Sequence, residues 1–170
     1  LLERGGRSWA LSSGMAAVQL VFSLLSAGDH VLMSEDLYGG TVRLAEEVFA
    51  GYGVTFEYVD VRDLALVGKR MRSETKLVFI ETPSNPMMQI ADIAALSALA
   101  HENGALLAVD NTFLSPHFQK PLTLGADIVL HSGTKYLCGH NDVIAGFLVL
   151  KDATSAQAKR IELLAKSAGP

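Results

Sequence analysis

The feature that most constrains this chain is a regular alternation of short apolar runs with segments of helical periodicity. The apolar runs predict strands at residues 30–33, 54–59, 77–80, 106–109, 128–130 and 145–150. The patterns between them predict helices at residues 15–25, 41–49, 93–102 and 155–165, with a weaker helical pattern at 61–70. Several strands have no polar face, as is typical of strands buried on both sides of a parallel sheet. The pattern therefore predicts an α/β domain with a mostly parallel central sheet and helices on both faces.

The composition fits one globular domain and excludes several classes of protein. Of the 170 residues, 49% are hydrophobic and 19% are charged, which is enough apolar material for a core. The net charge of −4 and the lack of a Lys/Arg cluster predict no nucleic-acid partner and no acidic membrane surface as a partner. The longest apolar run, residues 143–150, is far shorter than the about 20 residues that span a bilayer. The single cysteine, Cys138, excludes an internal disulfide and favours a cytoplasmic location.

The first predicted helix opens on a segment suited to an anion, in which Ser13 precedes Gly14 and Met15. Free backbone N–H groups and the positive end of the helix dipole at such a position can bind a phosphate. The same residues also fit an ordinary helix cap formed by Ser13. Taken alone, this segment favours the cap.

The segment from His131 to Tyr136 directly follows the predicted strand 128–130. Ligands of parallel sheets bind at this carboxyl end of the strands. Ser132 and Thr134 can donate to phosphate oxygens, and Lys135 is placed to act as a nucleophilic amine. Such a lysine must lose its proton, which burial and cationic neighbours favour. Taken alone, the segment also fits a polar loop with a solvated lysine.

Two more candidate residues follow predicted strands. Asp110 comes directly after the buried run 106–109, where an acid can meet a ligand or cap a turn. Tyr38 lies on a glycine-rich turn after the strand 30–33. Its ring can stack on a flat cofactor, or it can simply be half-buried.

A rigid turn follows the predicted strand 77–80, because Pro83 and Pro86 lie only three positions apart. This turn can present Asn85 to a ligand, although it can also be structural only. One of the bonds Thr82-Pro83 and Asn85-Pro86 is a candidate cis peptide, since rigid turns at sites favour that form. The five segments together supply phosphate binders, an acid, an aromatic face, an amide and a lysine. One ligand needs all of these: a flat, phosphorylated, cationic heterocycle that carries an aldehyde.

The chain resembles the Cys/Met-metabolism family of enzymes that depend on pyridoxal 5'-phosphate (PLP). This family includes cystathionine γ-synthase, cystathionine γ-lyase, cystathionine β-lyase, methionine γ-lyase and the O-acetylhomoserine sulfhydrylases. The matching segments occur in family order: Ser13-Gly14-Met15-Ala16-Ala17, Tyr38-Gly39-Gly40-Thr41, Glu81-Thr82-Pro83-Ser84-Asn85-Pro86, Val109-Asp110-Asn111-Thr112, and His131-Ser132-Gly133-Thr134-Lys135-Tyr136 followed by Gly139-His140-Asn141-Asp142. A chance match to all five is negligible beside that of one short motif. The resemblance implies the large domain of PLP-dependent transferases of the aspartate aminotransferase type (fold type I).

The resemblance also implies roles for individual residues. The catalytic residues would be Lys135, which would hold PLP as a Schiff base, Asp110, which would keep the pyridine nitrogen protonated, and Tyr38. Tyr38 would stack on the ring and assist acid–base steps. The phosphate would be held by the backbone amides of Gly14 and Met15 and the hydroxyls of Ser132 and Thr134. Asn85 would face the 3'-oxygen of the ring.

The implied reaction is transsulfuration of sulfur amino acids, by γ-replacement or γ-elimination, in a homotetramer built as a dimer of dimers. A synthase or a γ-lyase is favoured, with sulfhydrylase and β-lyase as alternatives. Gly39 stands where methionine γ-lyases tend to carry a reactive cysteine, so that member is less favoured. Family members are more than twice as long, so residues 1–170 are expected to be a partial PLP-binding large domain. The N-terminal arm and the C-terminal domain with its substrate-binding arginine would lie outside it.

Three other classes compete with this interpretation. A nucleotide-binding module would fit the sheet pattern, but neither G-x-G-x-x-G nor G-x-x-x-x-G-K-[ST] occurs. A zinc site could use His131, Cys138 and His140, but their spacing is not a convincing zinc pattern, so no metal is expected. An inactive scaffold that keeps only the fold is the third alternative, against which Asp110 and Lys135 both argue.

Overall fold

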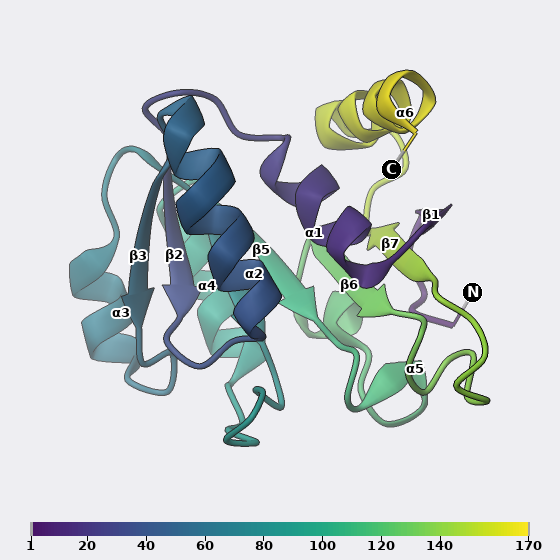
Figure 1. Cartoon of the computed structure of the whole chain (residues 1–170). Helices are drawn as coiled ribbons and strands as arrows, with labels where there is room; N and C mark the ends of the chain where they lie inside the picture. Colours follow the sequence, from purple (N-terminus) through teal and green to yellow (C-terminus); the bar gives the residue numbers. More distant parts are fainter. Residues whose placement is uncertain (1, 170) are drawn as a thin grey trace.

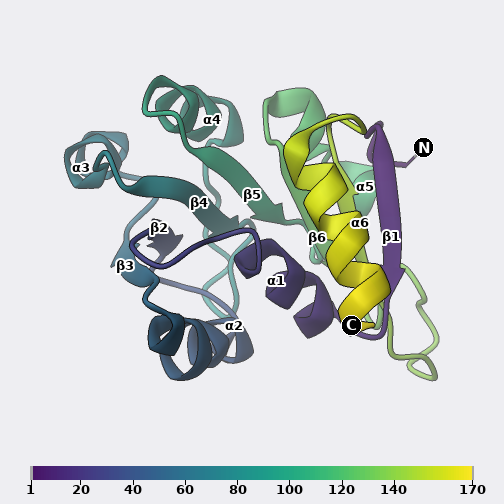
Figure 2. The same cartoon turned by 90° about the horizontal axis from the view of Figure 1, so that it is seen from above.

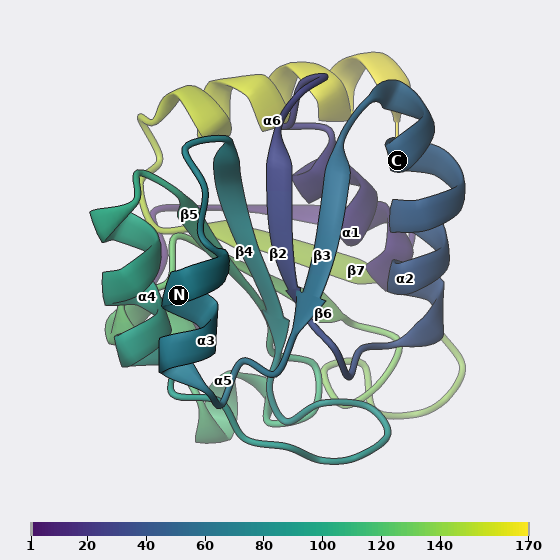
Figure 3. The same ribbon diagram turned by 90° about the vertical axis from the view of Figure 1, so that its left-hand side faces the viewer.

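The computed structural model describes residues 2–169, and its centre is one seven-stranded sheet. The strand order is β1-β7-β6-β5-β4-β2-β3. Five strands from β6 to β3 are parallel, while β7 runs antiparallel to β6 and β1 antiparallel to β7. The strands are β1 (Arg7–Leu11), β2 (His30–Ser34), β3 (Thr55–Val59), β4 (Thr75–Glu81), β5 (Leu106–Asp110), β6 (Ile128–Ser132) and β7 (Gly146–Leu150). Figure 3 shows β2, β3 and β4 running side by side in one direction.

Helices cover both faces of this sheet, as Figures 1 and 2 show. One face carries α1 (Gly14–Phe22), α2 (Gly39–Leu44) and α6 (Ala156–Ala168). The other carries α3 (Leu64–Arg70) and α4 (Ile93–Glu102). Shorter helical segments are α5 (Ser115–Phe118), the π-helical turn Ala45–Phe49 and the 3-10 turns Ala50–Tyr52 and Pro121–Leu124. The predicted α/β class, with a mostly parallel sheet between two helical layers, is confirmed.

The central strands of the sheet are largely apolar because their side chains alternate between two separate cores. In β2, Val31 and Met33 pack under α1, whereas Leu32 packs in the core on the α3 and α4 side. The ring of Phe22 at the end of α1 lies at the centre of the first core. Its centroid is 5.5 Å from that of Phe49 and 5.4 Å from that of Phe79. These two cores fix the sheet and therefore the edge at which the loops meet.

Side-chain caps mark where several helices begin. Ser13, Asp63, Asp92 and Ser155 each accept a hydrogen bond from the backbone N–H three residues on. Such caps satisfy N–H groups that have no acceptor within the helix. The predicted helix 93–102 has the observed bounds, and the weak pattern at 61–70 corresponds to α3.

The connections from β2 and β4 leave on opposite faces of the sheet. These two strands are neighbours, but the chain from β2 enters α2, whereas the chain from β4 leads to α4 on the other face. Divergence of this kind leaves a crevice at the carboxyl ends of the strands, where ligands bind in open α/β sheets. No helix among residues 2–169 is both long enough and apolar enough to cross a membrane.

Candidate functional site

A cavity of about 280 Å³ lies at the carboxyl ends of the parallel strands. All eight residues predicted from the sequence to bind the cofactor line it: Gly14, Met15, Tyr38, Asn85, Asp110, Ser132, Thr134 and Lys135. They come from the start of α1 and from the ends of β2, β4, β5 and β6. The other lining residues are Ser13, Val18, Thr41, Glu81, Thr112, Phe113 and Ile144. The fold therefore brings the five separate segments together, while their individual roles stay predictions.

The first turn of α1 presents free backbone donors to this cavity. Ser13 Oγ accepts from the Ala16 N–H at 3.1 Å, which leaves the N–H groups of Gly14 and Met15 without an acceptor in the helix. A Cβ on Gly14 would lie 2.8 Å from the Ser132 Cβ, so glycine lets α1 approach β6. The cap interpretation and the phosphate interpretation are thus compatible, because the cap uses a different N–H group.

Asp110 is held at the end of β5 by Thr112. The Thr112 N–H donates to Asp110 Oδ1 at 3.0 Å, and the Thr112 hydroxyl donates to the same oxygen at 2.5 Å. Burial raises the pKa of Asp110, and the two bonds from Thr112 oppose that rise. Both bonds go to Oδ1, so Oδ2 is left available to a cationic group in the cavity.

Lys135 lies on the exposed rim of the cavity, in the turn that follows β6. Its backbone N–H donates to the Ser132 carbonyl at 3.2 Å. The side chain is not buried among apolar groups in this chain, so the expected desolvation of the amine is not provided by residues 2–169. The hydroxyl of Thr134 is engaged with Ala145, whose carbonyl and N–H lie 3.2 and 3.1 Å from it. Thr134 would have to rotate its hydroxyl to donate to a phosphate.

Tyr38 is half-exposed and is the N-cap residue that precedes α2, where its backbone N–H donates to Glu81 Oε2 at 2.8 Å. A Cβ on Gly40 would lie 2.5 Å from Cε1 of Tyr38, so this glycine makes room for the ring. The glycine-rich turn therefore has a steric purpose beside the aromatic residue.

Glu81 is an acid whose role the sequence reasoning missed, although it lies within a quoted motif. It is only 6% exposed at the end of β4 and is the register partner of Asp110 on β5. Burial, with Asp110 and Asp36 nearby, raises the pKa of Glu81 to about 8, and the hydrogen bond from Tyr38 opposes that rise. The sequence signal that could have identified Glu81 is an acid at the end of a buried strand, in the same position as Asp110 at the end of its own strand.

Asn85 lines the cavity from the turn after β4. Both Thr82-Pro83 and Asn85-Pro86 are cis in this turn, so the predicted cis geometry is confirmed and holds for both bonds. The Gln119 side chain donates to the Thr82 carbonyl at 2.9 Å and so fixes the base of the turn.

The residues of the competing zinc interpretation lie apart. His131 points away from the cavity to the buried Glu3, with 2.6 Å between Nε2 and Oε1. His140 instead approaches the Cys138 carbonyl through Nδ1 at 3.0 Å. Among residues 2–169 no three His, Cys, Asp or Glu side chains are grouped so that they could hold a metal ion.

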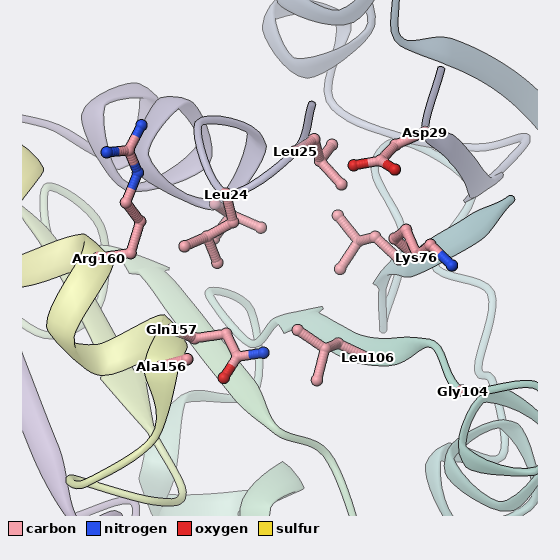
Figure 4. Close-up of a pocket in the computed structure, with 11 residues that line it drawn as sticks. Leu24, Leu25, Asp29, Lys76, Gly104, Leu106, Ala156, Gln157 and Arg160 are labelled. Atoms are coloured by element: carbon pink, nitrogen blue, oxygen red, sulfur yellow. The ribbon is translucent and has the colours of Figure 1, made fainter. Parts of the chain in front are cut away.

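A second cavity in the described part of the chain contains none of the predicted residues. It has a volume of about 380 Å³ and lies at the amino-terminal ends of the strands, on the edge opposite the site. Figure 4 shows Leu24, Leu25 and Leu106 around it, with Lys76 and Arg160 among its polar residues. Its lining includes an acid and a lysine, Asp29 and Lys76, but no helix start opened by a glycine and no residue of the five predicted segments. Volume alone therefore does not identify the site, whereas the convergence of the five segments does.

The whole chain matches one protein family. The model of the family described as Cys/Met metabolism PLP-dependent enzyme matches residues 1–170. The chain belongs to this family. Membership confirms the resemblance seen in the motifs and, with it, PLP as the cofactor of the family.

Relatives within the Cys/Met metabolism family include proteins of different named reactions. The chain is 53% identical over 151 residues to the cystathionine gamma-synthase/O-acetylhomoserine (thiol)-lyase of Bacillus subtilis (strain 168), covering 89% of this chain and 40% of that protein. It is 52% identical over 151 residues to a cystathionine beta-lyase of the same organism, covering 89% and 39%. The chain thus spans about 40% of the length of these relatives.

The fold agrees with that of a solved family member. The crystal structure of cystathionine gamma-lyase from Lactobacillus plantarum complexed with L-serine superposes with a TM-score of 0.96 and 49% identity. It matches 99% of this chain and 44% of that chain. The predicted fold type is therefore confirmed.

Proposed function

We propose that residues 1–170 are the cofactor-binding part of a large domain in a PLP-dependent transsulfuration enzyme acting on sulfur amino acids. The favoured type is a cystathionine γ-synthase or γ-lyase. The observation that carries this proposal is the shared cavity of Lys135, Asp110 and the free N-terminal turn of α1. An amine, a carboxylate and a phosphate site around one cavity match the reactive groups of one cofactor.

The donor set fits PLP at three separate points. The N–H groups of Gly14 and Met15 suit the phosphate, since a helix N-terminus favours an anion. Oδ2 of Asp110 suits the pyridine nitrogen, and Lys135 suits the aldehyde. The exposed Tyr38 ring offers a flat apolar face. Asn85, from the turn after β4, is proposed to face the 3'-oxygen.

PLP supplies an electron sink for the substrate's Cα when it is bound. Asp110 is proposed to hold a proton on the ring nitrogen, because a buried carboxylate hydrogen-bonded to a cation is a strong interaction of about 1.5–3 kcal/mol. Lys135 Nζ is proposed to move protons at Cα and along the substrate side chain. Tyr38 is proposed to orient the ring and to assist a proton transfer at Cβ.

The test of the cofactor assignment is Lys135→Ala in the full protein. Treatment with borohydride followed by peptide mass analysis should place reduced PLP on Lys135 in wild type and on no lysine of the variant. Lys69→Ala, an exposed lysine at the end of α3, is the matched control and should keep the label. Labelling of another lysine in wild type would overturn the assignment.

The reaction is tested by product analysis on the same protein. Cystathionine, O-acylhomoserine and methionine would be supplied in turn, alone, with cysteine and with sulfide as the nucleophile. Release of an α-keto acid from cystathionine by cleavage at Cγ, or replacement at Cγ of O-acylhomoserine, supports the proposal. Cleavage at Cβ alone supports a cystathionine β-lyase, the function of a relative at 52% identity. Net sulfide incorporation supports a sulfhydrylase, and retention of PLP without turnover supports the inactive scaffold.

We also propose that the protein works as a homotetramer in the cytoplasm, with a small amino acid as substrate. Large exposed apolar side chains in the loops that follow β4 and β6 support a subunit contact there: Met87, Met88, Tyr136, Val143 and Ile144. Light scattering of the Ile144→Asp variant tests the subunit contact. If Ile144 lies in the contact, the charge should lower the fraction of tetramer; if Ile144 lies on an open surface, the mass should stay as in wild type.

A further inference from the structure

Two acids cross-link the loops that carry Tyr38 and Asn85. Glu81 ends β4 and accepts from the Tyr38 N–H at 2.8 Å, although Tyr38 belongs to the loop after β2. Asp36 belongs to the loop after β2 and accepts from the hydroxyl of Ser84 and from the Met87 N–H at 3.1 Å, both in the loop after β4. Each loop therefore supplies a carboxylate that holds the other.

This exchange lies where the two connections diverge to opposite faces of the sheet. The pairing of β2 with β4 fixes where the two loops begin, but α2 and α4 then lead the loops apart on opposite faces of the sheet. The carboxylate bonds are the direct polar links between the loops.

Ser84, which donates to Asp36, is also held by bonds within the loop after β4. Ser84 is 3% exposed, and its hydroxyl oxygen accepts from the Gln89 N–H at 2.9 Å while its proton goes to Asp36. The Met88 N–H donates to the Ser84 carbonyl at 3.0 Å. Asp36 thus accepts a hydrogen bond from Ser84, a residue that several bonds already fix within the loop that carries Asn85.

We propose that Glu81 and Asp36 are positioning residues that fix Tyr38 and Asn85 relative to each other across the cofactor cavity. Glu81 acts through the backbone of Tyr38, and Asp36 acts through Ser84. Asp36 is not among the residues that line the cavity, so its effect on the cofactor is indirect. This inference rests on the proposed function, because it assigns the two acids to the same cofactor site.

The experiment measures PLP affinity and the absorption and fluorescence of bound PLP, with the unfolding free energy determined in parallel. Glu81→Ala removes the acceptor for Tyr38 and should weaken PLP binding by about tenfold, the loss expected for one strong hydrogen bond. Glu81→Gln keeps an acceptor oxygen and should recover most of that loss. Glu47→Ala, on an exposed part of the adjoining helix, is the control and should match wild type.

A double-mutant cycle tests Asp36. The double variant of Asp36→Ala and Ser84→Ala should weaken PLP binding by less than the product of the two single effects, because both single changes break the Asp36–Ser84 link and Asp36→Ala also frees the Met87 N–H. A changed emission spectrum of bound PLP should accompany the loss, which a general loss of stability would not produce.

Equal effects of Glu81→Ala and Glu81→Gln, or additive effects of the Asp36 and Ser84 changes, would overturn the positioning role. So would variants that lose unfolding free energy while PLP affinity and spectrum stay as in wild type. Failure of wild type itself to bind PLP would overturn the proposed function instead, and the two failures are thereby separate.

Discussion

The hydroxyl of Thr112 joins the ends of two neighbouring strands, because it donates to Asp110 Oδ1 at 2.5 Å and accepts from the Ser132 N–H at 2.8 Å. One side chain therefore sets both the acid of β5 and the start of the lysine-bearing turn after β6. The consequence is that the acid and the phosphate-side hydroxyl should respond together to changes at Thr112.

Thr112→Val keeps the shape of this side chain and removes its hydroxyl. PLP affinity should fall by roughly tenfold, since two bonds that orient the site are lost while the Thr112 N–H still holds Asp110. The pKa of Asp110 should rise further, because a hydrogen bond that lowers it is gone. Thr112→Ser should retain near wild-type affinity in the same PLP titration. Equal losses in both variants would assign the effect to packing.

Asp110→Asn tests the charge of the acid while keeping its size. Asparagine can accept from Thr112 through its amide oxygen, but it cannot neutralise a cationic ring. PLP should bind about 10- to 100-fold more weakly, which corresponds to the loss of a charge-assisted hydrogen bond. Turnover should fall more than binding, as comparison of kcat with PLP affinity would show. An unchanged kcat at saturating PLP would contradict the role of Asp110.

The raised pKa of Glu81 should make the free energy of unfolding of the PLP-free protein depend on pH. This pKa is raised from 4.5 to about 8 in the fold. Below the lower value both the folded and the unfolded chain carry the proton, so Glu81 adds no pH dependence. Between the two values only the unfolded chain ionises, so the free energy of unfolding falls as pH rises. Above the upper value the penalty stays constant.

Glu81→Gln should remove this decline, which amounts to at most about 5 kcal/mol at roughly 1.4 kcal/mol per pKa unit. Urea unfolding at a series of pH values, with the exposed Glu47→Gln as control, measures it. Parallel slopes for wild type and Glu81→Gln would show that Glu81 ionises normally.

Gly146 allows β7 to touch the residue that caps α1. A Cβ at this position would overlap the carbonyl oxygen of Ser13, so Gly146→Ala should cost about 1–3 kcal/mol of unfolding free energy through overpacking. It should also weaken phosphate binding, because the start of α1 must shift. Gly51→Ala is the control, since nothing lies within 4 Å of a Cβ there. Equal stability of the two variants by urea unfolding would refute the contact.

The sequence predicted the interior of this fold better than its margins. The six predicted strands all occur, most of them because short apolar runs leave few alternatives, and their observed bounds differ by one or two residues. The missed strand is β1, whose outer residues are exposed and whose partner, β7, is remote in sequence. This edge segment is a strand because it pairs with β7, so no local sequence pattern could predict it.

Helix ends show the same limit. The helix predicted at 15–25 ends at Phe22, because Ser23 closes it through its backbone and side-chain bonds to the Gln19 carbonyl. The helix predicted at 41–49 begins at Gly39 and passes into a π-helical turn at Ala45. The spacing of apolar residues does not indicate these changes in hydrogen bonding, because the same spacing continues beyond the point where the α-helix ends.

The site residues were predicted as a set because each lies in a short motif, but the links among them were not. Tyr38 and Glu81 are far apart in the chain, as are Asp36 and Ser84, and only the sheet order brings them together. Individual functional groups can be read from a segment, whereas the bonds that orient them depend on which strands are neighbours.

The packing of Gly146 on Ser13 has a consequence for the order in which the protein is made. The start of α1, which offers N–H groups to the phosphate, is synthesised early. The surface against which it packs is complete only when β7 has been synthesised and pairs with β6 and β1. Such contacts between distant parts of a chain form late, since a long loop must close first. A ribosome-bound chain that ends before Gly146 would therefore contain the anion-binding residues without the strand that packs against them. We expect such a chain to bind PLP only after the β7 segment has left the ribosome.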